Sequence, residues 1–127
     1  MLLNNKDLNI IVADDEENLR DFFDIFFERT FKIKITLFSN ADEAWEFIQR
    51  NTVHMVISDV NMPGNLNGLD MLQEVKSKFP SVIYICISGE DNEVVAKKRK
   101  VDAYLEKPFS VHQLHETVKQ FIQDEKK

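Results

Sequence analysis

The sequence lacks a second cysteine, a long hydrophobic segment and an excess of positive charge. Its only cysteine, Cys86, has no thiol partner within the chain for a disulfide, which fits a reducing compartment. The apolar residues at positions 1–3 are followed at once by polar ones, so they are far too few for a signal peptide or a membrane-spanning segment. We therefore expect a cytoplasmic protein that makes no contact with a membrane.

The charge balance disfavours anionic partners. Sixteen Lys and Arg residues against 22 Asp and Glu residues leave a formal net charge of -6, so direct binding of nucleic acid by this chain is not expected. One cluster, Lys97 to Lys100, has the opposite sign. Cations at the carboxyl end of a helix complement its dipole, which gives the cluster a structural interpretation. The alternative interpretation is a docking patch for an acidic partner.

Length and apolar periodicity predict the fold class. The 127 residues leave room for a single domain, over residues 1–127, with a folded core over about 8–124. Short apolar runs alternate with segments of helical spacing, which is typical of strands buried on both faces and joined by amphipathic helices. The apolar runs cover residues 8–13, 34–39, 53–58, 82–88 and 103–106. We therefore predict an α/β fold with a doubly wound, five-stranded parallel sheet and helices on both faces.

A helix is expected after each apolar run. The first turns a stripe of phenylalanines toward the sheet. Asn40 and Ser110 each precede a Glu or Gln three positions on, a capping-box pattern that starts the second and fifth helices. The third helix is expected to follow Gly68, and the fourth to cover residues 91–100. The fifth helix is predicted to bury Val111, Leu114, Val118, Phe121 and Ile122.

Charged and hydroxyl side chains stand at the carboxyl ends of the predicted strands. They are Asp14, Asp15, Asp59, Ser88 and Lys107. In an open parallel sheet, ligands bind outside this edge. Neighbouring carboxylates in an apolar setting repel each other unless they share a cation. Oxygen ligands from Asp15 and Asp59, with Asp14 acting directly or through water, suit a hard ion such as Mg2+.

This set of groups predicts phosphoryl transfer. A metal, a lysine and a small hydroxyl converging on one carboxylate stabilise the charge that spreads over the transferring group. Asp59 is then the acceptor, and Lys107 pairs with a carboxylate at rest or with a phosphoryl oxygen later. No cysteine or histidine stands at a strand end, so a thiol nucleophile or a zinc site is not expected.

The motifs together resemble one family over essentially the whole chain. Asp14-Asp15, ISDVNMPG around Asp59, ISGE around Ser88 and AYLEKPF around Lys107 stand in the order found in the receiver domain of two-component response regulators. The resemblance implies a flavodoxin-like, three-layer fold with strand order 2-1-3-4-5. It also implies a signalling domain rather than an enzyme. A sensor histidine kinase or a histidine phosphotransfer protein would phosphorylate Asp59.

The resemblance further assigns a metal site and a regulator of phosphate lifetime. Mg2+, or Mn2+ in its place, would be held by Asp14, Asp15, Asp59 and the backbone carbonyl of Asn61. Asn61 would also flank the route of the attacking water, together with Glu90. The Lys107-Pro108 peptide bond would be cis.

The resemblance also implies a switch. Ser88 would move to hydrogen-bond the phosphoryl group that Lys107 contacts, and Tyr104 would swing inward behind it. The fourth helix, fifth strand and fifth helix would form the output face, through which an output domain or protein is controlled and a phosphorylation-dependent homodimer forms. The cluster Lys97 to Lys100 would lie on this face. The stretch from Ser88 to Lys107 is shorter than the family pattern, which affects the fourth helix.

Two other functions stay open at this point. A degenerate receiver would act as a constitutive docking module, although every phosphorylation residue is present. A Mg-dependent phosphatase of the haloacid dehalogenase type also combines Asp and Lys on an α/β sheet. Its nucleophile lies in an early DxD motif whose second Asp is the general acid, whereas here Asn61 follows Asp59 by two residues and cannot donate a titrating proton.

Overall fold

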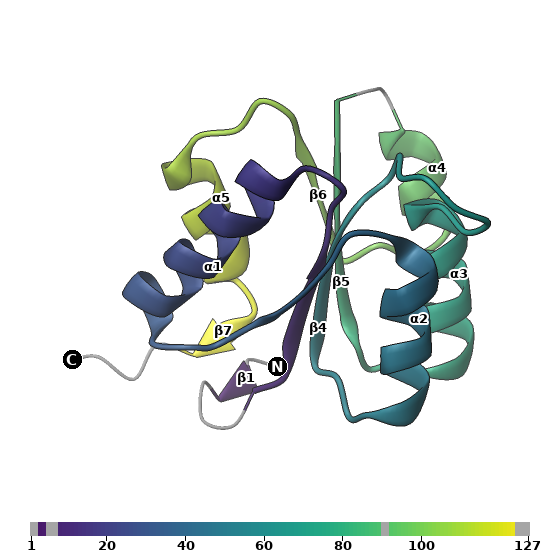
Figure 1. Ribbon diagram of the computed structural model, residues 1–127, viewed down its shortest axis with the longest axis horizontal. Coiled ribbons are helices and arrows are strands. Elements are labelled where there is room, and N and C mark those ends of the chain that lie inside the picture. Colours follow the sequence, from purple (N-terminus) through teal and green to yellow (C-terminus); the bar gives the residue numbers. More distant parts are fainter. Residues whose placement is uncertain (1–2, 5–7, 90–91, 124–127) are drawn as a thin grey trace.

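A five-stranded parallel sheet lies at the centre of the protein (Figure 1). The computed structural model describes residues 3–4, 8–89 and 92–123. The strand order β3-β2-β4-β5-β6 is the predicted order 2-1-3-4-5, since β2 is the first of these strands along the chain. The strands are β2 (Ile10–Ala13), β3 (Thr36–Phe38), β4 (Met55–Asp59), β5 (Ile83–Ser88) and β6 (Ala103–Glu106).

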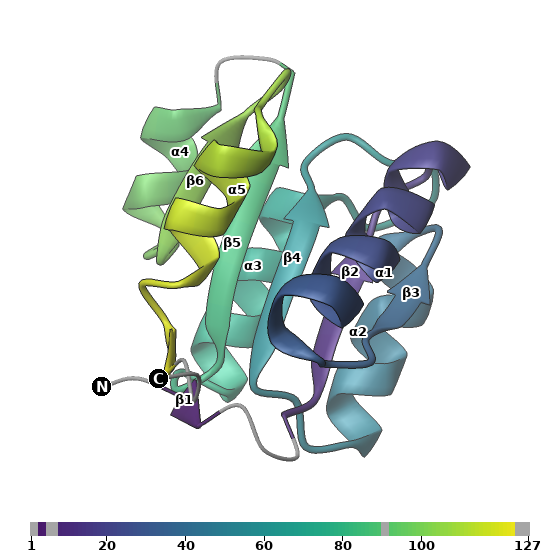
Figure 2. The ribbon, with the colours of Figure 1, turned by 90° about the vertical axis from the view of Figure 1, so that its left-hand side faces the viewer.

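Helices cover both faces of this sheet, as predicted. One face carries α1 (Glu17–Phe31) and α5 (Val111–Val118), which lie in front of the sheet in Figure 2. The other carries α2 (Ala41–Arg50), α3 (Gly68–Lys78) and α4 (Glu93–Lys98). Successive residues of a strand point to opposite faces. The fully buried β2 therefore contributes Ile10 and Val12 to the core under α1 and α5, and Ile11 and Ala13 to the other core.

The phenylalanine stripe of α1 packs on the sheet as predicted. Phe23 and Phe27 are fully buried, and Phe22 packs against Phe109 with ring centroids 6.4 Å apart. Full burial of each such side chain contributes about 2 to 3 kcal/mol to stability. The aromatic stripe thus fixes the helix that leads directly out of the Asp14-Asp15 segment.

Helix starts follow the predicted caps. Asn40 accepts a hydrogen bond from the Glu43 backbone N–H at 2.8 Å, and Ser110 forms a complete capping box with Gln113. A further cap at Asn67, which accepts from the Asp70 N–H at 2.8 Å, was not predicted. Each such cap stabilises its helix by about 1 kcal/mol.

Two predictions about the helices are wrong. The fourth helix is shorter than residues 91–100 and covers Glu93–Lys98. Val111 is 56% exposed, although its spacing from Leu114 and Val118 places it on the inward face of α5. Periodicity identifies a face of a helix, but it does not tell whether a neighbouring element covers that end of the face.

The structure adds a second, two-stranded sheet that the pattern does not predict. Strand β1 (Leu3–Asn4) lies beside β7 (Ile122–Gln123) in Figure 1. The two pair in parallel, with Leu3 opposite Ile122. Ile122 is buried as predicted, but as a strand residue, because α5 ends at Val118. Strands of two residues are too short to show an alternating pattern.

Candidate functional site

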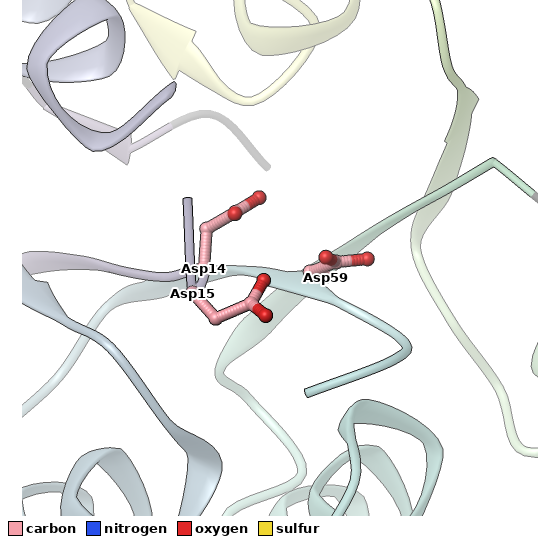
Figure 3. A group of neighbouring side chains, drawn as sticks. All are labelled: Asp14, Asp15 and Asp59. Atoms are coloured by element: carbon pink, nitrogen blue, oxygen red, sulfur yellow. The ribbon is translucent and has the colours of Figure 1, made fainter. Parts of the chain in front are cut away.

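Three carboxylates meet at the carboxyl edge of the central sheet. Asp14 and Asp15 follow β2, and Asp59 ends β4. These strands are neighbours, with Ala13 opposite Ser58, so both strand ends reach the same place. One oxygen from each carboxylate lies within 4.8 Å of the others (Figure 3). The edge therefore carries a concentrated negative charge.

Burial makes this charge costly. Asp14 is 0% exposed and Asp59 is 6% exposed, whereas Asp15 reaches solvent. Burial raises the pKa of Asp14 to about 6, against the lowering effects of the Glu16 backbone N–H and of Lys107. Burial likewise raises the pKa of Asp59, and the Lys107 ammonium opposes the shift. The site thus favours any cation that offsets the desolvation of these carboxylates.

Lys107 is the cation that faces the buried carboxylates. Its Nζ donates to Asp59 Oδ2 at 3.2 Å and lies 3.5 Å from Asp14 Oδ2 and 3.7 Å from Glu16 Oε1. Burial lowers the pKa of Lys107, but the negative charges of Asp14 and Asp59 outweigh this effect, so that its pKa is raised. The lysine therefore stays charged at neutral pH. The contact with Glu16 was not predicted.

The loop after β6 holds Lys107 in this position. The Lys107 backbone N–H donates to the Ser88 carbonyl at 2.8 Å, which ties it to the end of β5. The Lys107-Pro108 peptide bond is cis, which confirms the prediction. Through these links, β2, β4, β5 and β6 all contribute to one site.

The donor set fits a hard divalent cation such as Mg2+. Asp14 Oδ2 is buried and accepts no hydrogen bond from any residue that the structure describes. Its ion pair with Lys107 at 3.5 Å does not supply a hydrogen bond, and a metal ion would satisfy this buried oxygen. Asp14, Asp15 and Asp59 bring one oxygen each to within 4.8 Å of the others, and carboxylate oxygens are ligands that Mg2+ prefers.

Backbone geometry around Asp59 shapes the acceptor. The Asn61 backbone N–H lies 3.4 Å from Asp59 Oδ1, while Lys107 contacts the other oxygen. Gly68, the first residue of α3, packs so closely on the Asp59 carbonyl that a Cβ there would collide with it. The Gly68 N–H also donates to the Val60 carbonyl at 2.9 Å. Glycine at this position lets α3 begin directly against the acceptor strand.

Asn92 connects the two predicted switch residues. Its side-chain amide donates to Ser88 Oγ at 3.0 Å, and its backbone N–H donates to the Tyr104 hydroxyl at 3.0 Å. Ser88 is fully buried at the end of β5, next to the acceptor strand β4. Asn92 precedes α4 without capping it by a side-chain hydrogen bond. The start of α4 is therefore linked to both Ser88 and Tyr104.

Sequence reasoning did not single out Asn92. An asparagine before a helix predicts a cap, and here the side chain serves another partner. The structure brings together four of the predicted site residues: Asp14, Asp15, Asp59 and Lys107. Ser88 and Tyr104, the two predicted switch residues, are both hydrogen-bonded to Asn92. Glu90 lies outside the described residues.

The arrangement suits a carboxylate nucleophile. One oxygen of Asp59 accepts from Lys107 and the other from the Asn61 N–H. Asp14 and Asp15 lie close enough to share a metal ion with it. Such groups neutralise the charge that develops on a transferring phosphoryl group.

Within the described part of the chain, no helix has the length and apolar character needed to cross a bilayer.

Comparison with known proteins points to one family. The family model of the response regulator receiver domain matches residues 10–119. The chain is 29% identical over 120 residues to response regulator Rre1 of Synechocystis sp., covering 91% of this chain and 52% of that protein. It is 34% identical over 123 residues to the uncharacterized transcriptional regulatory protein YesN of Bacillus subtilis, covering 93% and 33%. The chain thus spans about half or less of these relatives.

A solved structure shares the fold. The beryllofluoride-activated NtrC4 receiver domain dimer superposes with a TM-score of 0.79 at 28% identity, covering 88% of this chain and 93% of that chain.

Proposed function

This chain belongs to the response regulator receiver domain family of two-component signalling, and we propose that Asp59 accepts a phosphoryl group in a Mg2+-dependent reaction. The observation that carries the proposal is the contact of Lys107 with the buried Asp59 carboxylate, beside Asp14 Oδ2, which accepts no hydrogen bond from any described residue. Asp14, Asp15, Asp59 and the Asn61 carbonyl would hold the ion. A sensor histidine kinase or a histidine phosphotransfer protein is the natural donor.

The reaction forms an oxygen–phosphorus bond at Asp59. One carboxylate oxygen of Asp59 attacks the phosphorus of the donor phosphohistidine, and the phosphorus–nitrogen bond breaks. The electron pair of that bond stays on the imidazole nitrogen, which takes a proton. A bound Mg2+ supplies charge neutralisation for the phosphoryl oxygens. Lys107, now 3.2 Å from Asp59 Oδ2, is placed to contact a phosphoryl oxygen.

Phosphorylation acts on the start of α4. We infer that Ser88 Oγ leaves the Asn92 amide, which now donates to it, when it moves to hydrogen-bond a phosphoryl oxygen. The Asn92 backbone N–H donates to the Tyr104 hydroxyl, so a movement of Asn92 would change the contacts of both Ser88 and Tyr104. The face formed by α4, β6 and α5 is then the output surface, which exposes Val94, Val95 and Val111. A homodimer of phosphorylated chains would use this face.

Further proposals concern the surroundings of the reaction. Asn61 is exposed next to the acceptor, which is the position from which it would influence the attacking water together with Glu90. The output partner is a further domain or a separate protein, and this domain itself binds no nucleic acid, in line with its net charge of -6. We place the domain in the cytoplasm, where such kinases act.

Incubation with a small phosphodonor tests the proposal. Phosphoramidate and Mg2+ should increase the intact mass by one phosphoryl group, and EDTA or Asp59→Asn should abolish the gain. Beryllofluoride with Mg2+ should shift the amide resonances of Ser88 and Tyr104. If the mass does not increase and beryllofluoride with Mg2+ does not shift these resonances, the domain is a constitutive docking module.

A further inference from the structure

A basic groove lies between α3 and the end of α4, outside the site described above. Its volume is about 370 Å3. The two helices that border it lie side by side in Figure 1. It is lined by Gln73, Lys76, Ser77, Lys98, Arg99 and Lys100. Four of these residues carry a positive charge in a chain whose net charge is -6.

The cations of this groove differ in how far they are already paired. Lys76 forms an ion pair with Asp102 at 2.6 Å and donates a hydrogen bond to the Val82 carbonyl at 2.7 Å. Arg99 lies 3.7 Å from Asp70, a separation too long for a direct hydrogen bond. Lys98 and Lys100 are exposed and form no ion pair with any described residue. The groove therefore retains positive charge for an external anion.

The structure divides the cluster Lys97 to Lys100, which the sequence pattern placed on the output face. Lys97 pairs with Glu93 at 2.9 Å, one helical turn earlier, and does not line the groove. Lys98, the last residue of α4, lines the groove together with Arg99 and Lys100, which follow the helix, and with residues of α3. The helix dipole accounts for cations near the end of α4. It does not account for their convergence with polar side chains of a second helix.

The backbone at Lys100 supplies an independent observation. Lys100, two residues after the end of α4, has a φ of 69°, and the neighbouring Val101 N–H donates to the Ala96 carbonyl at 3.1 Å. This left-handed position after a helix favours glycine, and a lysine there is strained. Lys32, with a φ of 59°, directly follows α1 in the same left-handed conformation but lies outside the groove. The two lysines form a matched pair that differs in surroundings.

We propose that the groove between α3 and α4 binds an acidic, extended segment of a partner protein. Carboxylates of the segment would pair with Lys98, Lys100 and Arg99, whose planar guanidinium suits a carboxylate. Gln73 and Ser77, four residues apart on α3, offer an amide and a hydroxyl to the peptide backbone. A nucleic acid fits less well, because its long phosphate backbone would extend beyond this single groove over a chain whose net charge is -6.

A fluorescein-labelled decapeptide of alternating glutamate and serine serves as the probe, and fluorescence anisotropy measures its binding to the full chain. Binding should weaken as salt is raised. Lys100→Gly should weaken it about threefold, and Lys98→Ala combined with Lys100→Gly about tenfold. Lys32→Gly removes the same charge from the same backbone conformation and should leave binding unchanged. Glycine relieves the left-handed strain at both positions, so neither midpoint of thermal unfolding should fall.

Several results would overturn this assignment. They are no binding of the acidic peptide at low salt, equal weakening by Lys32→Gly and Lys100→Gly, or tighter binding of a single-stranded oligonucleotide that the same double variant weakens. Amide shifts on peptide binding should map to Gln73, Ser77 and Arg99. Shifts confined to the Asp59 site would equally contradict it. Asp59→Asn leaves the groove intact and should bind the peptide as wild type does, so this test is independent of phosphorylation.

Discussion

Removal of the Asn92 side chain should make the domain easier to activate. The amide of Asn92 donates to Ser88 Oγ at 3.0 Å, and we expect this bond to break when Ser88 moves to contact a phosphoryl group. A hydrogen bond of this kind contributes about 1 kcal/mol net. Asn92→Ala removes that stabilisation from the resting state alone, which shifts the equilibrium toward the active state about fivefold. Because Asn92 does not cap α4 with its side chain, the helix loses no cap.

The assay is a titration with beryllofluoride in saturating Mg2+, followed by amide NMR. The apparent affinity of Asn92→Ala should be about fivefold higher than that of wild type. Asn40→Ala is the matched control, because it removes one asparagine side-chain hydrogen bond at the start of α2 and also costs about 1 kcal/mol in the free energy of unfolding. Its beryllofluoride affinity should stay unchanged. Equal or weaker affinity in Asn92→Ala would refute the proposed link.

Three further changes test the electrostatics and packing of the site. Lys107→Met leaves the buried Asp14 and Asp59 without the ammonium that pairs with them. The free energy of unfolding, measured with urea at neutral pH, should fall by about 2 kcal/mol, and Mg2+ should restore part of it. An equal fall with and without Mg2+ would contradict this. In EDTA, the free energy of unfolding should fall as pH rises from about 4 to about 6. The pKa of Asp14 in the folded state is about 6, above its ordinary value of 3.8, so the folded state binds the proton more tightly than the unfolded state does. Asp14 contributes at most about 3 kcal/mol to this fall. Asp14→Asn should remove that contribution and leave the part that comes from Asp59, whose pKa is also raised; an unchanged slope in that variant would exclude Asp14 as a cause. Gly68→Ala brings a Cβ into the Asp59 carbonyl and should cost about 1 to 3 kcal/mol and slow phosphorylation by phosphoramidate, whereas wild-type rates would show that α3 can shift freely.

The sequence predicts most of the fold because each central strand is buried on both faces. Continuous apolar runs such as the one that forms β4 mark these strands, and Asn40 and Ser110 mark helix starts by their caps. The end of α4 was misplaced because Lys100 adopts a left-handed conformation that usually calls for glycine. No local signal indicates that Val111 stays uncovered.

The site was predictable where topology alone brings residues together. Asp14, Asp59 and Lys107 stand at the ends of parallel strands, and such ends meet at one edge whatever the side chains do. The contacts of Asn92 and Glu16 depend on the path of loops and on side-chain direction, which sequence spacing does not determine. For the same reason, the groove beside Lys100 follows from the packing of α3 on α4 rather than from the basic cluster itself.

The most direct test of the central claim is to locate the phosphoryl group. The protein is incubated with phosphoramidate and Mg2+ and then treated with borohydride, which reduces an aspartyl phosphate to homoserine. Tandem mass spectrometry of the peptides identifies the altered position. We predict homoserine at position 59 alone, and none when EDTA is present. Homoserine at Asp14 or Asp15, or a phosphoryl group that persists in Asp59→Asn, would contradict the assignment of Asp59 as the acceptor.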